Sequence, residues 1–177
     1  MKKLGTGLPS IIFIKKYFPE PTIGCEVGLH RGLHALELCM YLEPKKLYLV
    51  DNWDTKASEG NIYCNHLDLE LAKKALGGFE YTEFIVSDSI NASYNFEDES
   101  LDWVYIDSNH DYESFSKDFD AWEKKVRFGG IVAGHDVNQP GVIKKIDEFS
   151  KSNKKEIAQM GHDWWFIKGI EHSYYII

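Results

Sequence analysis

Strand-like and helix-like segments alternate about five times along this 177-residue chain, and their order restricts the possible folds more than any other feature. Short, almost continuous apolar runs such as KLYLVD (46–51) are typical of parallel strands that are buried on both faces of a sheet. Two last runs at 156–160 and 164–168 are joined by only a few residues around Gly161, which favours an antiparallel pair. The expected fold is a three-layer, Rossmann-like α/β sandwich with a mostly parallel seven-stranded sheet and a C-terminal antiparallel hairpin.

Apolar periodicity gives approximate bounds for each expected element. The most regular helix follows residue 107, and we expect Gly129 and Gly130 to end it. Its apolar stripe consists of Phe115, Phe119, Trp122 and Val126. We expect a single domain over residues 1–177, in which residues 1–22 form a short N-terminal helical extension. The expected strands are 22–27, 46–51, 82–88, 101–107, 130–136, 156–160 and 164–168, and the other expected helices are 10–18, 32–42, 67–76 and 141–149.

Charge and composition exclude several classes of partner. The formal net charge is -8 and no long basic run is present, so we expect neither a nucleic-acid partner nor an anionic membrane partner. No stretch approaches the ~20 apolar residues of a membrane span. Lys15 and Lys16 interrupt the only early apolar run, which argues against a signal peptide. Three cysteines without CxxC spacing (Cys25, Cys39 and Cys64) indicate reduced thiols, and we expect a cytoplasmic protein.

Carboxylates occur at or just after the ends of all five predicted parallel strands. These residues are Glu26, Asp51, Asp88, Asp107 and Asp136. The carboxyl ends of parallel strands meet at one edge of a sheet, where ligands of such folds bind. A chance distribution of acidic loop residues explains one or two of these positions more easily than five. The sequence therefore predicts an acidic binding edge.

The first loop excludes the most common ligand of this kind of fold. Leu29 and His30 follow Gly28, so the loop does not match the dinucleotide fingerprint GxGxxG. Glu26 beside the loop would repel a pyrophosphate, although it suits a positively charged group. Asp51 lies at about the distance along the chain at which an acidic residue binds ribose hydroxyls. These features predict a nucleoside without phosphates that carries a positive centre.

Five segments of the chain carry a resemblance to a known family. They are EVGLHRG, YLVDNWD, VSDS, DWVYIDSNHDYESFSKDFDAW and GGIVAGHDV. Together they resemble the class I S-adenosylmethionine-dependent methyltransferases, most closely the subgroup of macrocin O-methyltransferases and cephalosporin-hydroxylase-like proteins. The resemblance extends from about residue 24 to about residue 168. It implies a methyltransferase, a transferase that uses S-adenosyl-L-methionine as its cofactor.

The resemblance also implies a role for each motif residue that binds the cofactor. Asp51 would hold the ribose hydroxyls. For Trp53, stacking near the adenosine and a place in the hydrophobic core fit equally well. Near the methionine and ribose the resemblance places Glu26, Gly28 and Gly32; near the adenosine it places Asn52, Trp53, Asp88 and Ser89.

Methyl transfer to a hydroxyl group of a sugar or another small molecule needs help from the protein, because a neutral hydroxyl is a poor nucleophile. In one scheme Asp107 and Asp136 bind Mg²⁺ or another divalent cation. In the other scheme no metal takes part, and His110 or His135 acts as general base beside Asp107. The chain departs from the catechol-type pattern because Val137 follows Asp136, so a third metal ligand is not evident.

Two alternatives stay open at this point: a non-catalytic module that binds the cofactor or a sugar, and an NAD-dependent oxidoreductase, against which Glu26 and the missing fingerprint argue.

Residues 1–22 and 55–65 are the only material for a lid. Either a bulky acceptor meets an open cleft, or a second subunit completes the site in a homodimer. We expect no role in catalysis or binding for His30, His34 or His172. The last hairpin is expected to contain His162, Asp163, Trp164 and Trp165.

Overall fold

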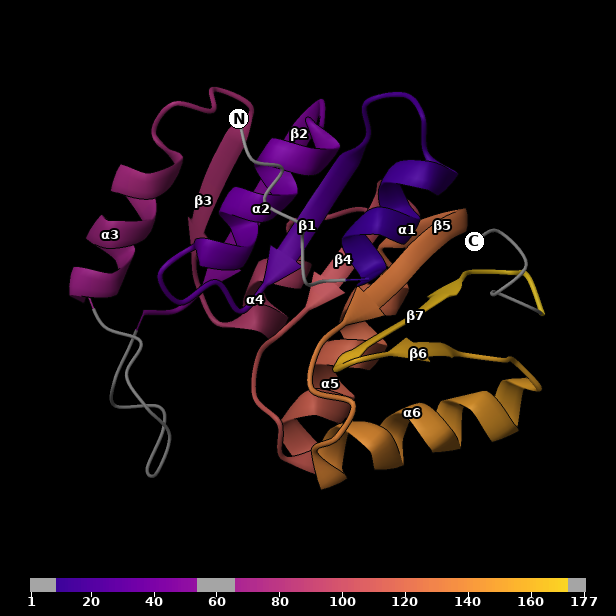
Figure 1. Ribbon diagram of the computed structural model, residues 1–177. Coiled ribbons are helices and arrows are strands. Elements are labelled where there is room, and N and C mark those ends of the chain that lie inside the picture. The colour runs from indigo at the N-terminus through magenta and orange to yellow at the C-terminus, as the bar shows by residue number, and fades with distance from the viewer. Residues whose placement is uncertain (1–8, 54–65, 172–177) are drawn as a thin grey trace.

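The computed structural model describes residues 9–53 and 66–171, which form a seven-stranded sheet between two groups of helices (Figure 1). The strands are β1 (Ile23–Val27), β2 (Lys46–Asp51), β3 (Thr82–Val86), β4 (Leu101–Ile106), β5 (Val126–Gly134), β6 (Ala158–Met160) and β7 (Asp163–Ile167). The helices are α1 (Pro9–Tyr17), α2 (Leu33–Leu42), α3 (His66–Leu76), α4 (Ser89–Ser93), α5 (Tyr112–Glu123) and α6 (Pro140–Asn153).

The strand order is β3-β2-β1-β4-β5-β7-β6. The first five strands in chain order are parallel, and β7 is antiparallel to both β5 and β6. The expected Rossmann-like sandwich with a C-terminal hairpin is therefore confirmed. The chain moves outward from β1 to β2 and β3 and then returns to β4 on the other side of β1. This reversal places a crevice at the carboxyl ends of β1 and β4, which is where such sheets bind ligands.

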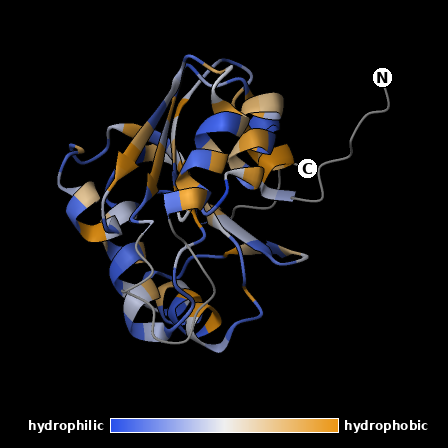
Figure 2. Ribbon diagram, turned by 90° about the vertical axis from the view of Figure 1, so that its left-hand side faces the viewer, coloured by the Kyte–Doolittle hydropathy of each residue, from blue (hydrophilic) through white to orange (hydrophobic). Residues whose placement is uncertain are grey.

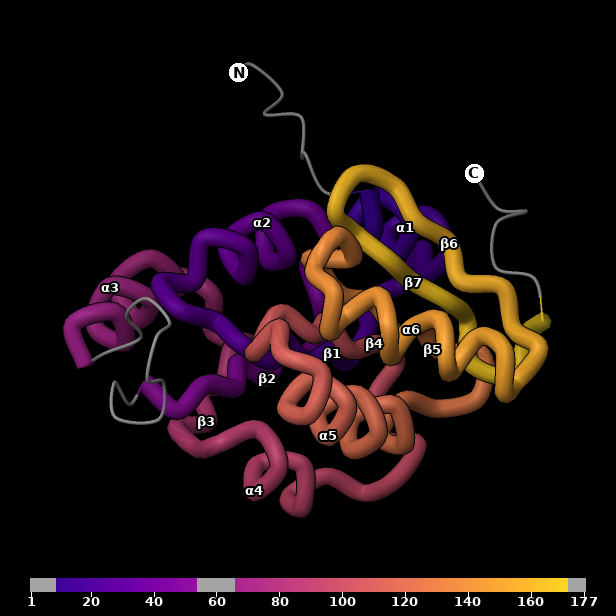
Figure 3. Tube along the Cα trace, turned by 90° about the horizontal axis from the view of Figure 1, so that it is seen from below, coloured from indigo at the N-terminus to yellow at the C-terminus, as the bar shows by residue number. Residues whose placement is uncertain are grey.

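Each face of the sheet carries its own hydrophobic cluster. Helices α1, α2 and α3 cover one face, and α4 and α5 lie on the opposite side (Figure 3). Helix α6 joins the second group, since Val142 and Ile146 belong to the same hydrophobic cluster as Phe119 of α5 and the ring of Phe149 lies against Phe119. Figure 2 shows hydrophobic residues along the strands, whereas the helices carry hydrophobic and hydrophilic residues on different sides. These amphipathic helices bury their apolar stripes against strands that are apolar on both faces.

The expected end of the helix after β4 is wrong. Helix α5 ends at Glu123, and Val126, which we had placed on the helix stripe, is the first residue of β5. Gly129 and Gly130 lie inside β5, where the register with β4 shifts. Gly129 has a φ of +74°, and a Cβ on Gly130 would collide with the carbonyl of Asp102. The glycines therefore allow an irregular strand to pass close to β4, and they do not terminate a helix.

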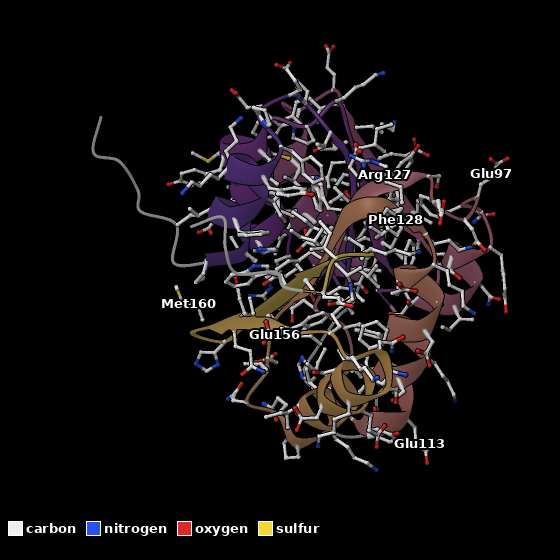
Figure 4. All side chains as sticks on the ribbon, turned by 90° about the vertical axis from the view of Figure 1, so that its right-hand side faces the viewer. Glu97, Glu113, Arg127, Phe128, Glu156 and Met160 are labelled. Atoms are coloured by element: carbon white, nitrogen blue, oxygen red, sulfur yellow. The ribbon has the colours of Figure 1, made fainter. Side chains whose placement is uncertain are left out.

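Two side chains at the irregular start of β5, Arg127 and Phe128, reach the surface of the molecule (Figure 4). Arg127 forms an ion pair with Asp102, with Nε 2.8 Å from Oδ1, and its guanidinium lies 5.4 Å from the ring centroid of Phe18. Phe128 is exposed and packs against Gly169. Met160 is exposed at the outer strand β6. These residues lie on the side of the molecule formed by β5, β6 and β7.

Helix α4 was not predicted, and the other elements lie within a few residues of their expected bounds. The N-terminal helix is present as α1, whereas residues 1–8 and the proposed lid segment 55–65 lie outside the described residues. Cys25 and Cys39 are buried free thiols, and burial raises the pKa of Cys39 to about 12. Cys64 lies outside the described part of the chain. Among residues 9–53 and 66–171, no helix has the length and apolarity needed to span a membrane.

Candidate active site

The five predicted carboxylates lie at or just after the carboxyl ends of the five parallel strands, at the same edge of the sheet. Glu26 lies in β1, Asp51 ends β2, and the others follow β3, β4 and β5. Burial raises the pKa of the Glu26 carboxyl, His34 opposes this effect, and the charges of Asp107 and Asp51 raise it further. The strands on both sides of β1 thus bring acidic groups within electrostatic reach of Glu26. The acidic edge that the sequence predicted is present.

Three side chains converge beyond the carboxyl ends of β4 and β5. Nε2 of His110 lies 2.8 Å from Oδ2 of Asp136 and 3.8 Å from Oδ1 of Asp107. One ligand atom from each of the three residues lies within 4.8 Å of the other two. We call Asp107, His110 and Asp136 the acidic triad. The sequence indicated all three residues, with the two carboxylates as the expected metal ligands and His110 as a general base, and it ranked a metal centre with histidine ligands lower.

Tight packing of two loops brings the acidic triad together. The side chain of Asp111 caps α5 by accepting a hydrogen bond of 3.0 Å from the backbone N–H of Ser114, which fixes the turn that carries His110. A Cβ on Gly141, at the start of α6, would collide with the backbone of His110 and Tyr112. The loop after β5 therefore rests directly on the loop after β4. Gly141 contributes to the site although the sequence gave no reason to select it.

The acidic triad has the chemistry of a divalent-cation site. His110 Nε2 is buried between two carboxylates and makes no well-aligned hydrogen bond among the described residues. Pairing with Asp107 and the charge of Asp136 raise the pKa of His110 against the opposing effect of partial burial. Metal binding replaces such a proton on a coordinating imidazole. Two carboxylates with one imidazole therefore fit a divalent cation, and the nitrogen ligand favours Mn²⁺ over Mg²⁺, which prefers oxygen ligands.

His135 lies beside the acidic triad. Its Nδ1 is 3.3 Å from Oδ1 of Asp136, and its ring stacks on His162 with centroids 5.6 Å apart. The indole N–H of Trp164 donates to the carbonyl of His135 at 3.0 Å, which fixes this backbone. His135 therefore lies beside Asp136, and His162 of the last hairpin adds a second imidazole, while the proposed role of His135 as a base stays a prediction.

Asp163 is a functional candidate that the sequence assigned only to the hairpin. Its side chain is fully buried, and Oδ2 accepts hydrogen bonds from the backbone N–H and the hydroxyl of Ser10. Oδ1 accepts a hydrogen bond of 3.2 Å from Tyr105 Oη and lies 4.0 Å from His135 Nε2. Each hydrogen bond to a charged group contributes roughly 1.5–3 kcal/mol. Asp163 therefore fixes α1 to the sheet directly behind His135.

Asp51 holds the first loop in place. Its Oδ2 accepts hydrogen bonds from the backbone N–H groups of Leu29 and His30 at 2.7 and 2.8 Å, and its Oδ1 accepts one from Trp53 at 3.2 Å. Trp53 follows Asn52 after β2; it is buried, and its indole N–H donates to the carbonyl of His30 at 2.9 Å. Trp53 thus has a core environment, while the proposed roles of Asp51, Asn52 and Trp53 toward an adenosine stay predictions.

The two glycines of the first loop each have a structural reason. Gly28 has a φ of +90°, and a Cβ there would collide with the backbone carbonyl of Asp107. Gly32 has a φ of +75° and packs on Leu76 and Ala72 of α3. Both conformations favour glycine. Gly28 therefore lets the first loop approach the end of β4 closely, and the expected contact of both glycines with a cofactor stays a prediction.

Asp88 and Ser89 lie at the start of α4, next to the end of β3. Asp88 caps this helix by accepting a hydrogen bond of 3.0 Å from the backbone N–H of Asn91. The hydroxyl of Ser89 accepts a hydrogen bond of 2.8 Å from the indole N–H of Trp122. Ser108 donates to the buried carboxyl of Asp118, whose pKa is raised by burial. This edge of the site is therefore fixed by hydrogen bonds, and the proposed contacts of Asp88 and Ser89 with an adenine stay predictions.

Comparison with known proteins gives one family match. A family model described as a methyltransferase domain matches residues 25–137. The matched region begins next to Glu26 and ends next to Asp136, so it contains the whole acidic edge. None of the curated proteins matches the chain by sequence.

Solved structures with the same fold include three with informative names. A methyltransferase candidate from Streptococcus mutans in complex with S-adenosylhomocysteine is 11% identical with a TM-score of 0.65, over 89% of this chain and 94% of that chain. An rRNA methylase from Streptococcus thermophilus is 14% identical with a TM-score of 0.63, over 89% and 91%. A TDP-rhamnose 3′-O-methyltransferase of calicheamicin biosynthesis is 13% identical with a TM-score of 0.62, over 92% and 79%. At these identities the likeness shows the fold alone.

Proposed function

The chain belongs to the methyltransferase-domain family, and on that premise we propose that it transfers a methyl group from S-adenosylmethionine to a hydroxyl group of a sugar or another small molecule. One observation carries the proposal: the acidic triad lies at the carboxyl ends of β4 and β5. It is next to the first loop, after β1, where we expect the cofactor to bind. A site built from acidic groups and imidazoles suits the activation of a hydroxyl more than the binding of phosphates.

Along the edge from β3 to β4, the polar residues occur in the same order as the parts of the cofactor that we assign to them. Asp88 and Ser89 follow β3, Asp51 ends β2, and Glu26 lies in β1, before the acidic triad begins. In this assignment the adenine lies near β3, the ribose near Asp51, and the amino-acid end near Glu26. When bound, S-adenosylmethionine supplies a methyl group on a positively charged sulfur, and this charge suits the acidic edge.

The acidic triad would hold a divalent cation of the Mg²⁺ or Mn²⁺ type. When bound, such a cation lowers the pKa of an oxygen acceptor. His135 lies on the other side of Asp136 and would take the proton of the acceptor hydroxyl at one of its ring nitrogens. Trp164 keeps the backbone of His135 in place, and the carboxylate of Asp163 lies 4.0 Å from Nε2 of its ring. The protein thus contributes alignment and proton transfer, while the cofactor supplies the reactive group.

A sugar hydroxyl is our choice of acceptor for two reasons. One structural neighbour acts on TDP-rhamnose, which is a sugar nucleotide. Another neighbour is an rRNA methylase, but the net charge of -8 opposes a nucleic-acid acceptor for this chain. A second subunit or a bulky acceptor would complete the open side of the crevice.

Thermal unfolding in the presence of candidate ligands tests this function. S-adenosylmethionine and S-adenosylhomocysteine should each stabilise the protein, because a ligand at 100 times its Kd adds about 2.7 kcal/mol. For a chain of this size that corresponds to a rise in Tm of roughly 5 °C or more. NAD should give no shift. A shift with NAD alone would favour an oxidoreductase and contradict the proposal. Cofactor binding without turnover on any hydroxylated acceptor would indicate a binding module.

A further inference from the structure

A buried pair of side chains on β1 and α2 lies at the centre of the acidic edge. Nδ1 of His34 is 2.8 Å from Oε1 of Glu26, and the Glu26 side chain is only 1% exposed. The second oxygen of Glu26, Oε2, is buried and has no hydrogen-bond partner among residues 9–53 and 66–171. Because an unpaired buried carboxylate oxygen is costly, this atom requires a donor that the described residues do not supply.

The surroundings hold His34 rigidly against Glu26. The ring of His34 packs on the ring of Tyr105, with centroids 4.0 Å apart. Tyr105 is itself fixed by its hydrogen bond to Asp163. Glu26 and Tyr105 are paired residues of neighbouring parallel strands, so both side chains point to the same face of the sheet. The imidazole therefore lies between the carboxylate and a fixed aromatic ring, which limits its rotation.

Charge also favours an ionised pair. Burial raises the pKa of Glu26, and the interaction with His34 opposes that rise. Burial lowers the pKa of His34, but the charge of Glu26 and the contact with it outweigh this effect, so the net change is upward. Protonated His34 compensates the charge of Glu26, while Asp51 and Asp107 add negative charge from the neighbouring strands. The Glu26–His34 pair can therefore accept a hydrogen bond from one additional positively charged donor at Oε2 of Glu26.

We infer that His34 is a positioning residue for the cofactor: it holds Glu26 through Oε1, so that Oε2 accepts a hydrogen bond from the ammonium group at the amino-acid end. This inference rests on the proposed function. The position of Glu26 on β1 agrees with this role. Strand β1 lies between β2, whose Asp51 is assigned to the ribose, and β4, which is followed by Asp107 of the acidic triad. An ammonium group is the donor that a buried carboxylate oxygen in an acidic site binds best.

Isothermal titration calorimetry with two ligands separates this role from a purely structural one. S-adenosylhomocysteine carries the amino-acid end, whereas 5′-methylthioadenosine has the same adenosine and thioether without it. His34→Ala should weaken S-adenosylhomocysteine binding at least about tenfold, which corresponds to the loss of one charge-assisted hydrogen bond. Binding of 5′-methylthioadenosine should change less than about twofold. His34→Gln, which keeps an N–H that can donate to Glu26, should recover part of the loss.

His66→Ala is the matched control, because His66 is exposed at the start of α3. It should bind both ligands like the wild type. The inference is overturned if both His34 variants bind S-adenosylhomocysteine like the wild type, or if they lose both ligands to the same extent. Should His34→Ala fail to fold, His34→Phe, which keeps a ring against Tyr105 but has no N–H for Glu26, takes its place under the same criteria. A wild-type protein that binds neither ligand would contradict the proposed function itself, which distinguishes the two failures.

Discussion

Replacing Asp107 by asparagine is expected to lower methyl transfer at least about 100-fold, because it removes a charge from the acidic triad without changing the shape of the side chain. Asp107 follows β4, and its backbone N–H donates to the carbonyl of Val27 at 2.8 Å. The backbone contacts that join β4 to β1 are therefore unaffected. Affinity for S-adenosylhomocysteine should stay within about threefold of the wild type, since Asp107 is assigned to the reaction and not to cofactor binding.

This prediction is measured as the formation of S-adenosylhomocysteine from S-adenosylmethionine over a panel of sugar nucleotides and simple hydroxylated molecules. The best acceptor of the wild type is then used for the variant. Asp147→Asn serves as control, because it makes the same chemical change on the exposed face of α6. Full activity of Asp107→Asn on that acceptor would remove the acidic triad from the mechanism.

Removal of divalent cations is expected to have an effect of similar size. Treatment with EDTA should reduce turnover at least about 100-fold, and Mg²⁺ or Mn²⁺ should restore it, because the acceptor oxygen then loses its activating cation. A direct readout is the binding of Mn²⁺, measured by electron paramagnetic resonance. The wild type should bind one equivalent, and Asp107→Asn or Asp136→Asn should weaken binding roughly 10- to 100-fold.

His110→Ala decides whether the imidazole is a metal ligand or a general base. As a ligand it should lower Mn²⁺ affinity and activity together, and excess metal should recover part of the activity. If the activity survives EDTA unchanged but disappears in His110→Ala, the reaction does not use the cation. His110, oriented by Asp136 at 2.8 Å, would then be the base.

The fold was largely predictable because strand burial is visible in a single sequence. The segment KLYLVD has the same bounds in the structure as in the sequence analysis, since strands buried on both faces need an unbroken apolar run. The error after α5 has a tertiary cause. The backbone N–H groups of Glu99 and Leu101 donate to the carbonyls of Lys124 and Lys125, and these contacts end the helix before its apolar stripe does. No local pattern reports such pairing.

The candidate site was predictable where it depends on strand ends and unpredictable where it depends on contacts between distant segments. Asp107 and Asp136 follow from their positions after β4 and β5. Asp163 meets Ser10 across 153 positions of the sequence, so no motif joins the two residues. His34 was given no role, because its importance comes from one oxygen of Glu26 that only the structure shows to be buried without a partner. Helix α4 had a visible signal in Asp88, whose capping role competes with the one we gave it.

The decisive experiment is a crystal structure of the protein with S-adenosylhomocysteine and Mn²⁺. We expect the ligand to cross the carboxyl ends of β2 and β1, with its amino-acid nitrogen at Glu26 and its sulfur directed toward the acidic triad. The metal should lie among Asp107, His110 and Asp136. A ligand bound away from this edge, or one whose sulfur points away from these three residues, would contradict the proposed mechanism.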